Sequence, residues 1–319
     1  MIAIKPYAEI LDVGTVDALK KIELVGRTCY KSEDKITDES APKFVEGLIK
    51  RGHEAMLEHA SFCFEIDYGV YYWMKESIHW LSTVHGFHSF MRFTVEDRIL
   101  MSGNVRAWRD LFKNMMEWVG IPACFEDFIK ENPVLFPEYQ DEVFIPTCLG
   151  SIRPIHVTDL KTEQEILTHW DVSVRFVVDR GISHEIVRHR PASFAQESTR
   201  YCNYGKDKFG NQITFIIPES FSYGSPEWYA WTDAMEYSEA YYLKLIEMGV
   251  QAQWARGVLG TSLKTELIMT ANCGEWIHFF KLRACNSTGK AHPQMLEVTR
   301  PLLDDFKDTI GVFEDLSYE

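Results

Sequence analysis

Apolar and polar positions follow two different periods along this chain, and these periods predict a mixture of helices and strands. Spacings of three and four residues between apolar positions predict amphipathic helices, whereas strict alternation predicts strands. Helices are expected at residues 16–26, 40–52, 104–118, 226–248, 251–259 and 273–285, with another from Arg180 or Gly181 to about His189. Strands are expected at residues 61–66, 172–178 and 214–218.

The segment 226–248 carries the clearest helical pattern, and Gly249 suits the position just after its end. Asp38 or Ser40 is expected to cap the helix at 40–52, with Pro42 in its first turn. The apolar stripe of the 226–248 helix consists of Ala234, Tyr237, Tyr241, Leu245 and Met248.

The order of these elements favours an α+β fold, with a mixed sheet flanked by helices. The helices and strands do not alternate regularly, as they would in a doubly wound sheet. Residues 120–165 contain several prolines and are expected to be irregular, and the pattern at residues 80–93 fits neither element. The sequence has no GxGxxG motif after a strand and no P-loop, which argues against common nucleotide-binding folds.

Composition bounds the protein class. A chain of 319 residues with 46% hydrophobic content can bury a sizeable core. Its net charge of -14 argues against nucleic-acid partners and against attachment to anionic membranes. No apolar run approaches the roughly 20 residues that span a bilayer, and the first residues do not resemble a signal peptide.

The cysteines favour a cytoplasmic protein with reduced thiols. Their number is odd and no CxxC pair occurs. They are Cys29, Cys63, Cys124, Cys148, Cys202, Cys273 and Cys285.

Two His-Glu pairs in the sequence are candidates for a metal site. His53-Glu54 and His184-Glu185 begin like zinc motifs, but neither is followed by a histidine at the required fourth position. The sequence therefore predicts no metal site.

The most informative stretch is the basic run from Arg188 to Tyr201. Three arginines and a histidine lie within thirteen residues of an otherwise acidic protein. Arginine binds phosphate with a planar, permanently charged fork, so the run indicates a pocket for a small anion. Charge alone leaves open a solvated turn, paired with Glu185 and Glu197.

The order of residues in this run resembles a known family. Arg188-His189-Arg190, followed after seven residues by Ser198, is similar to the signature of the flavin-dependent thymidylate synthases, and Thr199-Arg200-Tyr201 extends the likeness. Further similarity lies at residues 53–59, 182–187, 254–259, 270–272, 278–279 and 282–283. With the intervals between them, these blocks span about 45–67 and 170–300.

The resemblance implies a fold, an activity and an assembly. It implies one domain over residues 1–319 with the fold of that family, in which residues 68–169 are an insertion. It implies reductive methylation of dUMP to dTMP, with FAD as cofactor, methylenetetrahydrofolate as carbon donor and NADPH as reductant. It also implies a homotetramer whose sites are shared between subunits.

The resemblance also implies which residues of this chain form the binding sites. Arg283 is expected to be catalytic, as a fixed cation that favours ionisation of uracil at N3. The residues expected to bind the nucleotide are Glu185, Arg188, Gln196, Ser198, Arg200, Arg256 and Arg283. Those expected to bind the flavin are His53, Ala55, Arg188, His189, Arg190, Gln196, Asn272, Gly274 and His278.

The chain also departs from the family pattern. Ala55 replaces a residue that usually carries a hydroxyl, and Gly274 stands where some members carry arginine. Glu185 stands in place of the usual glutamine, and Ala195-Gln196 replaces the usual Asn-Glu pair. A carboxylate at position 185 requires an arginine partner beside a nucleotide phosphate.

Two other functions stay open. One is a flavin-dependent relative that hydroxymethylates a pyrimidine nucleotide, and the other is a nucleotide-binding module without flavin chemistry. Within the insertion, residues 103–109 are rich in hydrogen-bond donors and either contact a ligand or pack at a surface.

Overall fold

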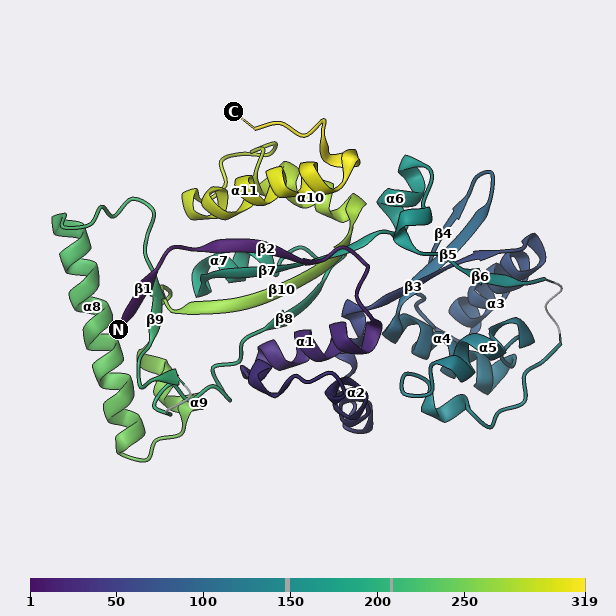
Figure 1. Cartoon of the computed structure of the whole chain (residues 1–319), viewed down its shortest axis with the longest axis horizontal. Coiled ribbons are helices and arrows are strands. Elements are labelled where there is room, and N and C mark those ends of the chain that lie inside the picture. Colours follow the sequence, from purple (N-terminus) through teal and green to yellow (C-terminus); the bar gives the residue numbers. More distant parts are fainter. Residues whose placement is uncertain (147–149, 207–208, 319) are drawn as a thin grey trace.

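The computed structural model describes residues 1–146, 150–206 and 209–318, and a four-stranded antiparallel sheet lies at its centre (Figure 1). The strand order is β2-β7-β10-β8, and Leu267 in the middle of β10 lies opposite both Phe176 and Gln196. The strands are β2 (Tyr7–Asp12), β7 (Asp171–Asp179), β8 (Ser193–Gln196) and β10 (Lys264–Asn272).

Helices cover both faces of this central sheet. On one face, Phe176 and Leu267 pack against Trp276 and Phe279. The helices of that face are α7 (Arg180–Ile186), α10 (Cys273–Arg283) and α11 (Pro293–Thr309). On the other face lies α1 (Ala18–Tyr30), with α2 (Ser40–Lys50) beyond it (Figure 1). Strands buried on both faces lose the polar alternation by which a strand is recognised in sequence.

A second four-stranded sheet, in the order β4-β5-β3-β6, lies at one end of the molecule (Figure 1). Its strands are β3 (Ser61–Ile66), β4 (Arg92–Val95), β5 (Ile99–Asn104) and β6 (Ile152–Pro154). The helices around it are α3 (Tyr68–His85), α4 (Val105–Trp118), α5 (Glu126–Glu131) and α6 (Glu163–His169).

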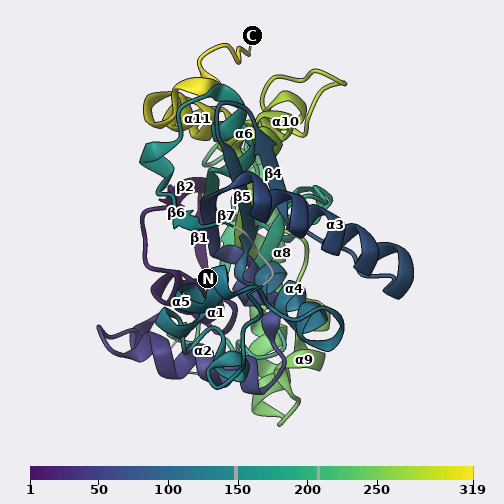
Figure 2. The same ribbon diagram turned by 90° about the vertical axis from the view of Figure 1, so that its right-hand side faces the viewer.

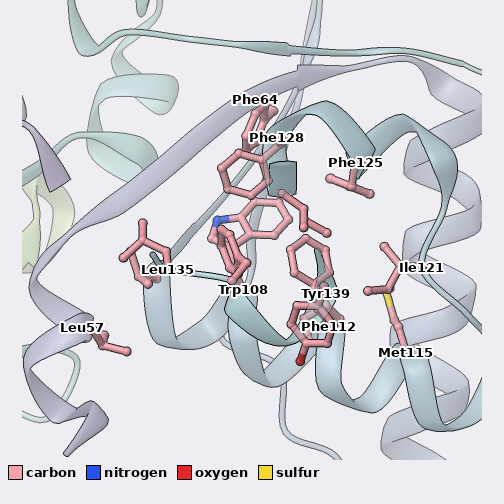
Figure 3. Close-up of a cluster of buried hydrophobic side chains, with 14 of the residues drawn as sticks. Leu57, Phe64, Trp108, Phe112, Met115, Ile121, Phe125, Phe128, Leu135 and Tyr139 are labelled. Atoms are coloured by element: carbon pink, nitrogen blue, oxygen red, sulfur yellow. The ribbon is translucent and has the colours of Figure 1, made fainter. Parts of the chain in front are cut away.

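This second sheet has its own aromatic core. Trp108 of α4 is fully buried, and its ring lies between 5.4 and 5.6 Å from those of Phe64, Phe112, Phe125 and Phe128 (Figure 3). Such edge-to-face clusters stabilise a core beyond their buried area. The segment 68–169 therefore builds much of a second hydrophobic core, which α1 and α2 also join through Ile22, Val45 and Leu48.

The opposite end of the molecule is formed by a parallel pair of short strands and a long helix (Figure 1). Phe215, Trp231 and Tyr242 form its core. The elements are β1 (Ile2–Ile4), β9 (Thr214–Ile216), α8 (Pro226–Glu247) and α9 (Ala252–Ala255).

The α+β prediction is confirmed, as are the expected helices and strands, within a few residues at their ends. The expectation that residues 120–165 are irregular is wrong in part, because α5, β6 and the start of α6 lie there. Residues 80–93 contain the end of α3 and the start of β4, and Figure 2 shows α3 extending away from the rest of the chain. No helix in the described ranges is both long and apolar enough to cross a membrane.

Two details of helix packing were predicted wrongly. The expected stripe of α8 is largely exposed, with 68% of Tyr237 and 55% of Tyr241 accessible, whereas Trp231 and Tyr242 form its buried face. Aromatic residues occur on both faces of α8, so periodicity alone does not choose between them. Neither Asp38 nor Ser40 caps α2, since the Ser40 hydroxyl instead donates a hydrogen bond to Glu23.

Candidate functional site

The basic run leaves the end of α7, turns, and enters β8, so its two ends have different surroundings. Arg188 and Arg190 are exposed on either side of the buried His189. Ser193 then pairs with Thr270 of β10, and the extended backbone continues to Glu197. At about 3.3 Å per residue, the Cα atoms of Ser193 and Glu197 lie roughly 13 Å apart. The two ends of the run are therefore separated by the length of β8.

At the first end, Arg283 of α10 is held by groups from α7 and the turn that follows it. Its Nη1 lies 3.2 Å from a carboxylate oxygen of Glu185, and its Nε lies 3.4 Å from Nε2 of His189. Burial, together with the nearby charges of Arg283 and His278, lowers the pKa of His189 to about 4. His189 is therefore neutral at pH 7, and its Nε2 can accept the hydrogen bond that Nε of Arg283 donates. Arg283 is the arginine partner that a carboxylate at position 185 requires.

At the other end, the residues assigned to the nucleotide lie near α9. Arg256 donates a hydrogen bond of 2.9 Å to the Thr199 hydroxyl. Arg200 is exposed, with its guanidinium carbon 5.6 Å from the centre of the Tyr201 ring. The backbone amide of Ser198 donates to Cys29 of α1, which fixes the turn. Arg256 and Arg283 are thus attached to opposite ends of the run.

Gln196 is committed to contacts inside the chain. Its Nε2 donates to the Ser183 hydroxyl of α7 at 2.9 Å and to the Thr265 hydroxyl of β10 at 3.2 Å. The assignment of the amide nitrogen and oxygen follows from this network. Only its carbonyl oxygen is left for a ligand if these bonds are kept.

A buried charge network behind the run was missed from the sequence. Glu197 is 2% exposed, and its carboxylate accepts hydrogen bonds from Tyr204 and Lys264, both at 2.9 Å. Lys264 also donates to Glu266, as does Lys31, which directly follows α1. Burial alone would raise the pKa of Glu266, but the two lysines lower it to about 2. The signal in the sequence was the pair Lys264 and Glu266, which share one face of a strand with a buried interior.

A cavity of about 580 Å³ lies beside the turn that precedes β8. One wall contains Arg190, Ser193 and Asn272, and the facing wall comes from the segment 90–110. Asn272 also caps α10, since its side-chain oxygen accepts a hydrogen bond of 2.8 Å from the amide of Glu275. Asn272 therefore combines a structural role with a place in the cavity wall.

The remaining flavin candidates are spread more widely. His53 and Ala55 are exposed at the start of the 3₁₀ turn Glu54–His59, which packs against β8. His278 is exposed on α10, with its ring centre 5.8 Å from that of His189. Gly274 packs tightly, because a Cβ atom there would lie 3.2 Å from the carbonyl oxygen of Leu167. A side chain at position 274 would therefore require Leu167 to shift by a few tenths of an ångström.

His59 belongs to the core. It is fully buried and its Nδ1 lies 2.7 Å from the Thr270 hydroxyl, so it supports β10. Burial lowers its pKa to about 3. The described residues contain no group of three or more histidine, cysteine, aspartate and glutamate side chains placed to hold a metal ion.

Four of the cysteines, Cys29, Cys63, Cys273 and Cys285, offer no activated thiolate. Burial raises the pKa of Cys29 to about 11 and that of Cys63 to about 12, and it also raises the pKa of Cys273 and Cys285. A raised pKa keeps a thiol protonated and weakly nucleophilic. Cys148 lies outside the described residues.

Comparison with known proteins finds similarity on both sides of the second sheet. The family described as "Thymidylate synthase complementing protein" matches residues 13–73 and 157–310. The flavin-dependent thymidylate synthase of Pyrococcus furiosus is 34% identical over 191 residues, which cover 59% of this chain and 71% of that protein. The enzyme of the same name from Geobacter sulfurreducens is 38% identical over 108 residues, or 34% of this chain and 45% of that protein.

One solved structure can be aligned with this chain over nearly its whole length. It is a UMP/dUMP methylase, PolB, from Streptomyces cacaoi bound with 5-Br dUMP, and the likeness covers 98% of this chain and 95% of that one. At 14% identity and a TM-score of 0.42, it carries no argument about this chain.

Proposed function

Because this chain belongs to the family of thymidylate synthase complementing proteins, we propose that it is a flavin-dependent thymidylate synthase. It would convert dUMP to dTMP, with methylenetetrahydrofolate as carbon donor and NADPH as reductant. The observation that carries the proposal is the setting of Arg283, a cation fixed between the Glu185 carboxylate and the neutral His189 ring.

The setting of Arg283 suits activation of a uracil ring. A fixed guanidinium stabilises negative charge as it develops on a neighbouring group, without reorganising during the reaction. The neutral His189 ring accepts a hydrogen bond from Arg283 and carries no positive charge of its own. Arg283 therefore keeps its charge and its orientation. Arg283 would favour loss of the N3 proton and so make C5 of the uracil more nucleophilic.

We propose that the cavity beside Arg190 receives part of a bound FAD. Arg190 lines it, and within the described ranges this arginine has no carboxylate partner, so its charge is available to a phosphate. Bound FAD would supply the hydride transfer that reductive methylation needs. The chain's own part is to bind the phosphates through Arg190 and to orient the cofactor along a wall that includes Asn272 and Ser193.

We propose that complete sites form between subunits of a homotetramer. Arg283 and Arg256 are both expected at the nucleotide, yet they are attached to opposite ends of the basic run. A second copy could bring the missing arginine to each site. The exposed stripe of α8 supports association, because large apolar side chains such as Tyr237 and Met248 rarely stay exposed together in a monomer.

We propose that residues 68–169 are an insertion within a single domain. The match to the family stops at residue 73 and resumes at residue 157, while β3 pairs with both β5 and β6 of the intervening segment. The scattered free thiols, such as Cys29 and Cys285, favour a reducing cytoplasm.

The test is product formation by the purified protein. With FAD, methylenetetrahydrofolate and NADPH, we expect NADPH oxidation that depends on dUMP, with dTMP identified by mass spectrometry. A hydroxymethylated nucleotide would instead indicate the related flavin chemistry, and a protein that binds dUMP but no flavin would be a nucleotide-binding module. Either result would overturn the proposal.

Arg283→Ala tests the residue on which the proposal depends. We expect kcat to fall at least a hundredfold, as when a preorganised donor is removed, with flavin absorbance unchanged. Arg283→Lys, which keeps the charge but not the fork, should retain part of the activity. Near-normal turnover in Arg283→Ala would exclude the assigned role.

A further inference from the structure

Glu197 directly precedes the turn 198–201, where the basic run leaves the central sheet. Its backbone amide donates a hydrogen bond of 2.8 Å to the carbonyl of Glu266, so it extends the pairing of β8 with β10 by one residue. Ala195 lies two residues earlier, and therefore on the same face of the sheet, and it packs with Val25 of α1. The Glu197 side chain thus lies on the face of the sheet that α1 covers.

A chain of hydrogen bonds joins the Glu197 side chain to the end of α1. Glu197 accepts bonds of 2.9 Å from both Tyr204 and Lys264. Lys264 donates to Glu266 at 2.7 Å, and Lys31, which directly follows α1, donates to the same carboxylate oxygen at 2.8 Å. The four charged side chains are at most 20% exposed. Because buried charges are costly unless they are paired, these groups hold one another in fixed positions.

The edge of this network is also paired. Lys31 donates to Glu33 at 2.9 Å as well. Arg175 lies 3.9 Å from the second carboxylate oxygen of Glu266 and forms an ion pair with Glu9. Each of these cations faces a carboxylate, so the network is not itself a site for an anion. What it provides is a fixed position for the residue that precedes the turn.

That turn presents two arginines that are expected at the nucleotide. Arg200 lies in it and is exposed, and Arg256 is attached to it by a hydrogen bond of 2.9 Å to the Thr199 hydroxyl. The amide of Ser198 donates to the carbonyl of Cys29 in α1 at 3.0 Å. The turn is therefore tied to the end of α1 twice, once through this backbone bond and once through the charge network.

We propose that Glu197 is a positioning residue for the phosphate of the nucleotide. This rests on the proposed function, in which Arg200 and Arg256 bind dUMP. Glu197 holds the turn in place before the nucleotide arrives, so that binding does not have to order the two guanidinium groups. Arg283 is held by groups at the other end of the run, so the chemical step should not depend on Glu197.

The experiment separates KM from kcat in the purified, full-length protein with FAD. Glu197→Ala removes the acceptor that Tyr204 and Lys264 share. It should raise KM and the calorimetric dissociation constant for dUMP about tenfold, the loss expected for a hydrogen bond to a charged group. The value of kcat should change by less than about twofold. Glu197→Gln keeps an acceptor for Lys264 and an amide that can donate to the Tyr204 oxygen, so it should retain most of the affinity.

Two further variants and a second ligand serve as controls. Glu33→Gln removes a carboxylate from the edge of the same network, where it contacts Lys31, and should leave KM for dUMP unaltered. Tyr204→Phe removes one donor without opening a cavity, and should raise KM about threefold even if Glu197→Ala does not fold. Deoxyuridine, which lacks the phosphate, should inhibit the unchanged protein and these variants equally.

Arg200→Gln tests the nucleotide site itself. If Arg200→Gln raises KM for dUMP but Glu197→Ala and Tyr204→Phe do not, the inference about Glu197 is wrong and the nucleotide site stands. If Glu197→Ala weakens deoxyuridine as much as dUMP, Glu197 does not act on the phosphate, and the inference is again wrong. If the unchanged protein does not bind dUMP, both the inference and the proposed function fail.

Discussion

His169 and His59 are buried histidines that hold the molecule together in their neutral form. His169 lies between two hydroxyls, 2.7 Å from Ser102 and 3.0 Å from Thr94, and burial lowers its pKa to about 4. The pKa of His59 is lowered to about 3 by burial and by Lys21. Both rings therefore resist protonation in the folded state, whereas in the unfolded chain they titrate near 6.5.

We expect the free energy of unfolding to decrease as the pH is lowered from 6.5 to 4. Between pH 6.5 and pH 4 the unfolded chain binds more protons than the folded one, so the free energy of unfolding decreases as pH falls. At pH 5 the loss is about 2 kcal/mol for one such histidine. Urea denaturation at pH 7 and pH 5 measures it, and His169→Gln should reduce the loss by about that amount.

A matched change tests whether His169 itself is responsible. His156→Gln alters an exposed histidine in the segment that leads to α6 and should leave the difference between pH 7 and pH 5 as it is in the unchanged protein. If His169→Gln shows the same difference as His156→Gln, His169 does not account for the acid sensitivity.

Single site residues could be predicted where the order and spacing of residue types indicate a chemical role. The basic run could be named because three arginines cluster in an acidic chain, whereas Arg283 was assigned from the resemblance to the flavin-dependent thymidylate synthases. The Glu197–Lys264–Glu266 network could not, because its members come from distant segments and look like surface charges until the sheet buries them. The pairing of Arg283 with Glu185 likewise needed the contact between α7 and α10.

At the scale of elements, the pair Arg92–Asp171 joins β4 of the second sheet to β7 of the central sheet. Only 11% of the Asp171 side chain is exposed, and Arg92 keeps the pKa of Asp171 below its usual value against the opposing effect of burial. Asp171→Asn leaves the guanidinium largely buried without its counter-charge. We expect it to lower the free energy of unfolding by about 3 kcal/mol, the cost of breaking a buried pair.

An exposed ion pair in the segment 68–169 serves as the control for the Arg92–Asp171 pair. Lys130→Gln breaks the contact with Glu126 on the surface of α5, which should cost less than about 1 kcal/mol. Urea denaturation of both variants gives the two losses. Equal losses would mean that Arg92 and Asp171 do not fasten the second sheet to the first.

Burial on both faces made a strand harder to predict but did not prevent it, since β7 was predicted and β10 was missed. α4 was found with its ends nearly correct, because its apolar face is continuous and its other face is polar. β10 was missed although it is one of the two inner strands of the central sheet, since seven consecutive residues within it are buried and no alternation remains. The position of α8 was predicted correctly, but its buried face was not. Tyr237 and Tyr241 have the spacing and the aromatic rings of core residues, yet both are exposed.

At the scale of the whole molecule, that exposed stripe predicts association through α8. Tyr241→Glu places a charge on a face that we expect to be buried between copies. The dissociation constant of the assembly should rise about thirtyfold or more, the effect of losing an aromatic anchor. Sedimentation of the protein over a range of concentrations measures it. Val143→Glu, at an 84% exposed position far from α8, should leave association unaltered, and unchanged sedimentation of Tyr241→Glu would exclude this interface.

Sites shared between subunits make a separate prediction about mixtures of inactive variants. Arg283 is attached to the start of the basic run and Arg256 to its end, so a nucleotide that needs both would take them from two chains. Arg283→Ala and Arg256→Ala should each be nearly inactive alone. Co-expressed in equal amounts, they should recover about a quarter of the activity, because random assembly leaves about one site in four with both arginines intact.

A mixture of two variants at one position provides the matched control. Arg283→Ala combined with Arg283→Met cannot rebuild any site, so it should stay as inactive as either variant alone. Activity is measured as dUMP-dependent NADPH oxidation at a concentration that keeps the assembly intact. If the Arg283→Ala and Arg256→Ala mixture gains nothing over this control, each site draws both arginines from one chain, and the chain must then change shape to bring the two ends of the run together.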